Sequence, residues 1–223
     1  MKELKRAISK MRARGAPGPD DLPPQFFKAL GDKALAALLH IFNESWKAGF
    51  CPQIWRNAVI IPLLKAGKPP SEIESFRPVS LTSVAVKILE RMIADRLYHM
   101  AEENGWFSHL QAGFRKGRSC EDQIIRLTQA IEDGLQKDPM ERSIIVLLDF
   151  SKAYDMVWRE RLLSIMTEKG VTLQYLRWFF AFLQNRQAKV RYCDATSKAR
   201  TMRQGLPQGS VLSPLLFVFT STS

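Results

Sequence analysis

The sequence lacks several features that mark large classes of proteins. It contains no run of roughly 18 or more apolar residues, so no segment is predicted to span a membrane. Its first six residues are mostly charged, and no apolar signal core follows them. The three cysteines, Cys51, Cys120 and Cys193, are isolated and have no His or Cys at ligand spacing. These absences argue against a disulfide framework and a zinc site, and they favour a nuclear or cytoplasmic protein.

Acidic residues are also scarce relative to basic ones. The 223 residues include 33 Lys and Arg but only 22 Asp and Glu, which gives a formal net charge of +11. Such a charge indicates a polyanionic partner, and nucleic acid is the commonest one for a soluble chain. An acidic membrane surface is the less favoured alternative. With 46% hydrophobic residues the chain can bury a core, as one large or two small domains.

The first 25 residues are predicted to form a basic helix followed by a rigid loop. Leu4, Ile8 and Met11 recur at helical spacing among six basic residues, which indicates an amphipathic helix. Its basic face either is solvated or contacts phosphate groups. The segment Ala16–Asp20 contains two prolines and one glycine, so it is a loop with a restricted backbone. That loop is either a linker or a contact to a phosphate backbone.

Most of the remaining chain shows clear periodicity. Helical spacing of apolar residues predicts helices over 26–46, 83–103, 120–135, 159–168 and 173–183. A strand is predicted over 57–64, and 189–192 with 199–202 indicate a hairpin. Ser119 and Asp122 have the spacing of a capping box at the start of the third helix.

The interpretation of the other segments depends on the stretch 142–159. Residues 143–148 form an apolar run, rich in β-branched side chains, that predicts a strand buried on both faces. Asp149 follows at its carboxyl end, where open α/β sheets place ligand chemistry and where a cation such as Mg²⁺ is a natural partner. Taken alone, an aspartate in this position is more often a turn former or a helix cap. Asp155, just before the predicted helix 159–168, is expected to be such a cap.

Two glycine-rich segments carry further candidate residues. The segment 111–119 is dense in glycine and basic residues, and 203–217 is a glycine-bracketed loop that leads into a helix. The second has few bulky side chains near its glycines, which suits the close passage of a base pair, although a loop before a helix is the default explanation. Lys65 on a Gly/Pro turn and Arg77 on the returning strand could converge on a triphosphate.

Four motifs in order resemble those of reverse transcriptases from non-LTR (LINE-type) retrotransposons: Arg77–Leu81, Gln111–Arg115, Asp149–Asp155 and Gln204–Ser210. The loop Ala16–Asp20 resembles the N-terminal extension of the same group. The resemblance implies an α+β protein with the right-hand fold of polymerases, comprising fingers and an incomplete palm but no thumb. The implied divisions are 1–25 for the basic helix and loop, 26–141 for the fingers and 142–223 for the partial palm.

The same resemblance implies a set of functional residues. Asp149 would be the catalytic ligand of two Mg²⁺ ions, and Phe150 would offer its carbonyl as a second metal ligand. The ring of Tyr154 would collide with a 2′-hydroxyl and so select deoxynucleotides. Nucleic-acid contacts are implied for Arg115, Lys116 and Arg118. The implied nucleotide-binding residues are Lys65, Arg77, Tyr154, Gln204, Gly205, Pro207, Gln208 and Gly209.

The implied activity is RNA-directed DNA polymerisation by two-metal nucleotidyl transfer, with an RNA template, a DNA primer and dNTPs as partners. The family's next palm motif, an aromatic residue followed by x-Asp-Asp, does not follow Phe217, and one aspartate holds two Mg²⁺ ions poorly. The isolated chain is therefore expected not to polymerise. The alternative function is a non-catalytic module, derived from a reverse transcriptase, that binds RNA or an RNA–DNA hybrid. A group II intron or telomerase relative is a less favoured interpretation.

Overall fold

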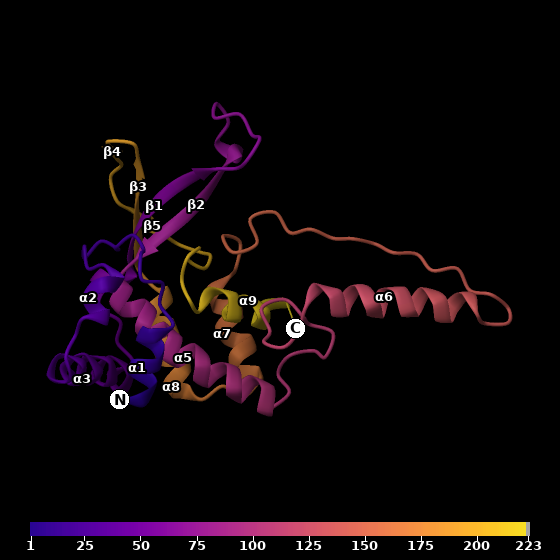
Figure 1. Ribbon diagram of the computed structural model, residues 1–223, viewed down its shortest axis with the longest axis horizontal. Coiled ribbons are helices and arrows are strands. Elements are labelled where there is room, and N and C mark those ends of the chain that lie inside the picture. The colour runs from indigo at the N-terminus through magenta and orange to yellow at the C-terminus, as the bar shows by residue number, and fades with distance from the viewer. Residues whose placement is uncertain (222–223) are drawn as a thin grey trace.

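The computed structural model describes residues 1–221 and shows a small mixed sheet standing on a body of helices, with one helix, α6, projecting away (Figure 1). The helices are α1 (Lys2–Ser9), α2 (Pro24–Lys28), α3 (Asp32–Ala48), α4 (Gln53–Arg56), α5 (Val84–Glu103), α6 (Cys120–Leu135), α7 (Arg159–Glu168), α8 (Leu173–Leu183) and α9 (Ser213–Ser221). The strands are β1 (Asn57–Leu64), β2 (Phe76–Thr82), β3 (Arg186–Tyr192), β4 (Ala195–Thr196) and β5 (Arg200–Met202). The predicted α+β class is confirmed.

The sheet brings together strands from both halves of the chain. Its order is β2-β1-β3-β4, and β5 pairs with β3. β1 runs antiparallel to β2, with Ile60 opposite Ser80, and parallel to β3, with Ala58 opposite Ala188. β3 and β5 are antiparallel, which confirms the predicted hairpin in outline. One face of the sheet therefore combines side chains that are distant in the sequence.

The core lies among the helices beneath the sheet, and α8 supplies three of its largest side chains. Trp178, Phe179 and Phe182 of α8 are fully buried. The rings of Trp178 and Phe182 stack with centroids 5.1 Å apart, and the Trp178 indole N–H donates to Ser45 Oγ of α3 at 3.2 Å. Burial of such rings is a large apolar contribution to stability, and the indole has the hydrogen bond that burial requires. No helix within residues 1–221 is both long and apolar enough to cross a membrane.

Several predicted helices are confirmed because their apolar periodicity is local. α5, α7 and α8 lie where the spacing of apolar residues places them, and α1 buries Leu4 and Ile8 as predicted. Met11 is buried too, but it follows the end of α1 at Ser9. The capping box of α6 is present, since Ser119 Oγ accepts from the Asp122 N–H while the Asp122 carboxylate accepts from the Ser119 N–H. The predicted helix 26–46 is instead two helices, because Gly31 has an extended backbone and becomes the N-cap of α3.

The strand predicted over 143–148 is wrong. This run has no regular secondary structure and is solvent-exposed, with Ile144 at 90% and Leu147 at 88% of full exposure. No segment within residues 1–221 pairs with it, and Figure 1 shows its trace running back from α6 apart from the sheet. An apolar run becomes a strand only where a neighbour takes up its backbone hydrogen bonds. Asp149 therefore does not lie at the end of a buried strand.

Asp155 does not cap the following helix, so that prediction is also wrong. The N-cap position of α7 is Trp158, and no side chain makes a cap hydrogen bond there. The Asp155 N–H donates to the Lys152 carbonyl inside a turn. Val157 and Trp158 lie between that turn and Arg159, the first residue of the helix. The turn is held by contacts to a loop near the C-terminal end of the chain, which sequence spacing does not reveal.

Candidate functional site

The glycine-rich loop Gln204–Gly209 lies against the edge strand β2 on one side. The N–H of Ser80 in β2 donates to the carbonyl of Gln208 at 2.7 Å. Gly209 has φ +113°, and a Cβ at this position would lie 2.6 Å from the Ser80 carbonyl oxygen. Both the backbone angle and the close approach require glycine here. The sequence suggests that a base pair passes close to this loop. At Gly209 the close neighbour is instead the protein's own backbone, at Ser80.

On its other side the same loop lies against the turn before α7. The N–H of Gly205 donates to the Val157 carbonyl at 2.9 Å, and the N–H of Leu206 donates to the Tyr154 carbonyl at 2.8 Å. Gly205 has φ +81°, and a Cβ there would lie 2.7 Å from the Asp155 carbonyl oxygen. The loop therefore bridges the sheet and the α7 turn through main-chain contacts that leave no room for side chains.

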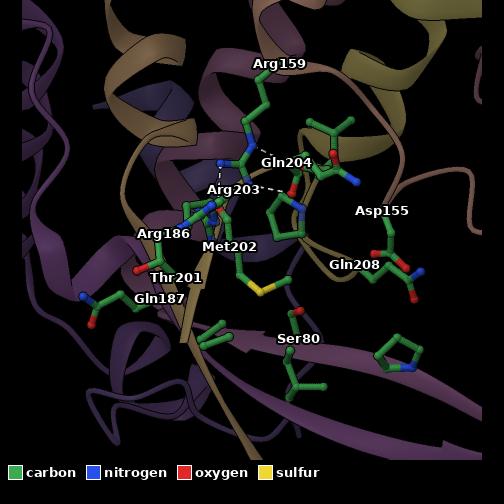
Figure 2. A pocket seen from close by; sticks show the side chains of 17 residues that line it. Ser80, Asp155, Arg159, Arg186, Gln187, Thr201, Met202, Arg203, Gln204 and Gln208 are labelled. Carbon is green, nitrogen blue, oxygen red and sulfur yellow. Dashed lines mark hydrogen bonds between the residues drawn. The ribbon is translucent and has the colours of Figure 1, made fainter. Parts of the chain in front are cut away.

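A pocket of about 510 Å³ opens between this loop and the sheet (Figure 2). The sheet contributes one face, including Ile60 and Ser80 from paired positions of β1 and β2. The loop contributes Gln204 and Gln208, whose amides can both donate and accept hydrogen bonds. Asp155 closes the side nearest the α7 turn. The volume is that of a typical small-molecule site, which lies at roughly 300–1,000 Å³.

Two buried arginines give the pocket wall positive charge. Arg186 is 3% exposed and lines the pocket, and burial lowers its pKa to about 10. It donates to the Phe182 carbonyl at 3.1 Å and lies over the Phe182 ring. Burial also lowers the pKa of Arg159, and burial raises the pKa of Asp155 while Lys152 opposes that shift. With a pKa of about 10, Arg186 stays cationic at neutral pH, and this charge suits an anionic ligand.

The comparison with known families agrees with the motifs around this pocket. Residues 64–222 match the family described as reverse transcriptase (RNA-dependent DNA polymerase). The chain belongs to the reverse transcriptase family. The matched range includes β2, the turn before α7 and the whole glutamine–glycine loop.

Curated relatives confirm the non-LTR type of this reverse transcriptase domain. It is 36% identical over 222 residues to a probable RNA-directed DNA polymerase from transposon BS of Drosophila melanogaster. It is 32% identical to the RNA-directed DNA polymerase from mobile element jockey of Drosophila funebris. Each match covers 99% of this chain and 24% of the relative, so the chain spans about a quarter of their length.

Among solved structures, a partial Cas6-RT-Cas1–Cas2 complex matches with a TM-score of 0.47 and 19% identity, over 99% of this chain and 32% of that one.

The predicted metal ligands of the reverse transcriptase domain are not assembled. Asp149 lies on the exposed, unpaired run, and Phe150 is 73% exposed. Phe150 lines a separate cavity of about 300 Å³ together with Trp158 and Phe217. Residues 1–221 contain no group of three or more His, Cys, Asp or Glu side chains placed to hold a metal. The described residues therefore do not fit a Mg²⁺ pair, which needs several oxygen ligands in fixed positions.

Lys65 and Arg77 lie near the end of the β1–β2 pair where β1 finishes and β2 begins. Lys65 follows β1, and its Nζ donates to the Glu74 carbonyl at 2.6 Å. Arg77 is exposed on β2, opposite Leu63. Neither side chain lines the 510 Å³ pocket. That these two side chains bind a triphosphate stays a prediction.

Tyr154 takes part in the site through its backbone rather than its ring. Its carbonyl accepts from Leu206, while its ring lies 5.3 Å from the Phe217 ring and 6.3 Å from the Phe114 ring, centroid to centroid. Burial raises the pKa of its hydroxyl. The ring does not line the pocket, and its role in selecting deoxynucleotides stays a prediction.

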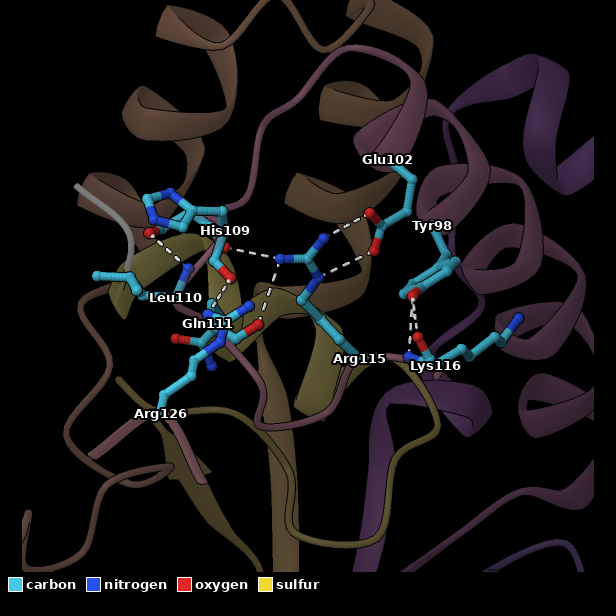
Figure 3. A network of polar contacts seen from close by, with 9 residues as sticks. Tyr98, Glu102, His109, Leu110, Gln111, Arg115, Lys116 and Arg126 are labelled. Carbon is cyan, nitrogen blue, oxygen red and sulfur yellow. Dashed lines mark hydrogen bonds and ion pairs between the residues drawn. The ribbon is translucent and has the colours of Figure 1, made fainter. Parts of the chain in front are cut away.

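Arg115 holds its own loop through a network of polar contacts (Figure 3). Its guanidinium forms two hydrogen bonds to the Glu102 carboxylate, at 3.0 and 2.6 Å, and donates to the carbonyls of Ser108 and Gln111. The Arg115 side chain is only 7% exposed, and its hydrogen bonds lower the pKa of Glu102. Its donors are thus committed within the protein, since a guanidinium has five.

The neighbours of Arg115 are more open to solvent. The backbone N–H of Lys116 donates to the Tyr98 hydroxyl at 2.8 Å, and the Lys116 Nζ lies 3.3 Å from Asp95 Oδ1. The Lys116 side chain is 63% exposed, and Arg118 is exposed as well. These two cations face solvent, where a nucleic-acid backbone can reach them, and that contact stays a prediction.

Sequence reasoning missed three charged residues that border the loop: Glu90, Arg159 and Arg186. All three are buried. For Glu90 a signal existed, because it shares a helical face with the buried residues Val86 and Ile93 of α5. An acidic side chain within an apolar stripe indicates a specific hydrogen-bond partner. Arg159 and Arg186 carry no comparable local signal.

Proposed function

We propose that the chain forms the fingers (26–141) and the first part of the palm (142–223) of an RNA-directed DNA polymerase. Its 510 Å³ pocket receives the incoming dNTP, while the exposed basic side chains contact an RNA template and a DNA primer. The rigid seating of the Gln204–Gly209 loop beside that pocket is the observation that carries the proposal.

The loop suits nucleotide binding because its shape is set before a ligand arrives. Backbone hydrogen bonds to β2 and to the α7 turn hold it from two sides, so little ordering cost remains for the binding step. The amides of Gln204 and Gln208 can bond a base or sugar, and buried Arg186 supplies positive charge for an anionic ligand. These residues bind and orient the substrate.

The test is steady-state dNTP incorporation on an RNA template by a polymerase that contains this chain. Gln208→Ala removes hydrogen-bonding atoms from the pocket wall, and loss of one such bond costs about 1 kcal/mol, or about fivefold. We expect KM for the dNTP to rise by about that factor. The matched control is Gln136→Ala, an exposed glutamine at the C-cap of α6. Equal KM values for the two variants would overturn the proposal.

The second candidate function is a binding module without catalysis. It is favoured by one observation, the exposure of Asp149 on an unpaired run with no carboxylate cluster among residues 1–221. Such a module binds an RNA–DNA hybrid but incorporates no dNTP, and Asp149→Ala leaves its binding unchanged. An enzyme loses incorporation with Asp149→Ala while hybrid binding persists. Filter binding and primer extension on the same preparation separate the two functions.

A further inference from the structure

Two buried ionisable side chains, one acidic and one basic, hold the two ends of the glutamine–glycine loop. Arg159 from α7 binds the end that begins near Met202, and Glu90 from α5 binds the end that leads into α9. Both residues lie below 8% of full exposure, Arg159 at 7% and Glu90 at 0%. Charged side chains are rarely buried unless specific partners satisfy them, so their placement here calls for a structural role.

Arg159 binds three main-chain carbonyls with one guanidinium. Its Nη1 donates to Met202 at 2.8 Å, its Nη2 to Gln204 at 2.9 Å and its Nε to Gly205 at 2.9 Å. Figure 2 shows this guanidinium above the pocket, pointing at the loop. The three carbonyls lie around one planar group, so the fork fixes the direction of each peptide in that turn. Lysine has one nitrogen and cannot reproduce this arrangement.

Glu90 acts on the opposite end of the loop as a hydrogen-bond acceptor, because that end presents donors. One carboxylate oxygen, Oε2, accepts from the Val211 N–H at 2.7 Å, from the Leu212 N–H at 3.1 Å and from the Ser210 hydroxyl. These groups directly precede α9, where unpaired N–H groups favour an anion. The other oxygen, Oε1, has no hydrogen-bond partner within the described residues. Glu90 thus directs its hydrogen bonds at the loop.

We propose that Glu90 and Arg159 are positioning residues that together hold the Gln204–Ser210 loop in the shape that admits the incoming nucleotide. This inference rests on the proposed function of the pocket. Neither residue needs to touch the nucleotide through its hydrogen-bonded atoms, because those atoms already face the loop backbone. Their effect reaches the substrate through Gln204 and Gln208, which lie between the two anchored ends.

The first arm of the experiment measures substrate binding in a polymerase that contains this chain. Glu90→Gln places an amide NH₂ or a weaker acceptor before the loop N–H groups, and Arg159→Lys retains charge but loses the fork. We expect each variant to raise KM for the dNTP about tenfold, with a smaller change in kcat and an unchanged Kd for template–primer. The matched controls are Glu103→Gln and Arg161→Lys, exposed residues on the same two helices.

The second arm measures the loop itself in the 223-residue chain, by amide hydrogen exchange. Glu90→Gln should accelerate exchange of the Val211 and Leu212 N–H groups at least tenfold, while Glu103→Gln should not. If Glu90→Gln fails to fold, Ser210→Ala removes one donor to the same oxygen and replaces it in both arms.

The outcomes separate this inference from the function on which it rests. Unchanged exchange, or faster exchange with an unchanged KM for the dNTP, overturns the positioning role. Absence of dNTP incorporation by the wild-type polymerase overturns the proposed function instead. A rise in KM that accompanies faster exchange supports both.

Discussion

The loop at 203–213 and the run at 141–150 differ in how their backbones are satisfied. Arg159 donates to the carbonyls of Gln204 and Gly205 in the loop and of Met202 just before it, and the loop amides of Val211 and Leu212 donate to Glu90. In the run, every residue is exposed and no strand within residues 1–221 pairs with it. Both segments carry family motifs, yet only one is built into a site.

The difference shows that a motif becomes a site through contacts from elsewhere in the chain. The loop receives partners from β2, α5 and α7, which lie about 45 to 130 residues earlier in the sequence. The run at 141–150 has the stronger local signal, since its apolar side chains favour a strand, but no strand within residues 1–221 pairs with it. Local sequence pattern alone therefore favours the run at 141–150 over the loop, whereas only the loop is built into a site.

The largest expected effect comes from shortening a leucine in each region. Leu212 is fully buried, whereas Leu147 is 88% exposed. Leu212→Ala should lower the free energy of unfolding by about 2–5 kcal/mol, because it removes buried methyl groups and leaves a cavity. Leu147→Ala should change it by less than about 0.5 kcal/mol. Urea denaturation of the 223-residue chain checks both values, and equal losses would show that the run is buried in solution.

A smaller effect is expected from alanine at two glycines with positive φ. Gly205 has φ +81° and no room for a Cβ, whereas Gly117 has φ +69° and open space around it. Gly117→Ala should cost only the backbone strain, about 1–2 kcal/mol. Gly205→Ala should cost a further 1–3 kcal/mol, about the penalty of overpacking against the Asp155 backbone. Denaturation midpoints measure the difference, and a difference of zero would contradict the close approach.

Sequence patterns predicted those parts of the structure whose causes are local. α5, α7 and α8 follow from apolar spacing, the cap of α6 from Ser119 and Asp122, and the importance of the glutamine–glycine loop from its glycines. The contacts of that loop depend on long-range pairing, so the roles of Glu90 and Arg159 were not predicted. The strand at 143–148 was predicted wrongly for the same reason, because strand formation needs a partner that periodicity cannot supply.

The smallest effect is a pH dependence that comes from the loop and is absent from the exposed run. Burial raises the pKa of Glu90, while Ser210, Leu212, Arg186 and Lys87 oppose that shift. The folded chain therefore holds a proton at pH values where the unfolded chain has lost it. As pH rises above the ordinary value of 4.5 toward the raised pKa, Glu90 makes the folded state less stable relative to the unfolded state.

Glu90→Gln removes this contribution, so the difference in unfolding free energy, wild type minus variant, should fall as pH rises through that window. Denaturation series at several pH values measure the difference. The control Glu103→Gln, exposed on the same helix, should give a difference that does not follow this course. A wild-type-minus-Glu90→Gln difference that increases with pH would mean that the pKa of Glu90 is lowered by folding.

The most direct test of the central claim is photo-crosslinking of a dNTP analogue in a polymerase that contains this chain, with an RNA template and DNA primer bound. We expect the label to fall on the peptide containing Arg203–Ser210 and to be lost when unlabelled dNTP competes. Labelling confined to the segment around Lys65 and Arg77, with none on the loop, would contradict the placement of the nucleotide site in the pocket beside Gln204 and Gln208.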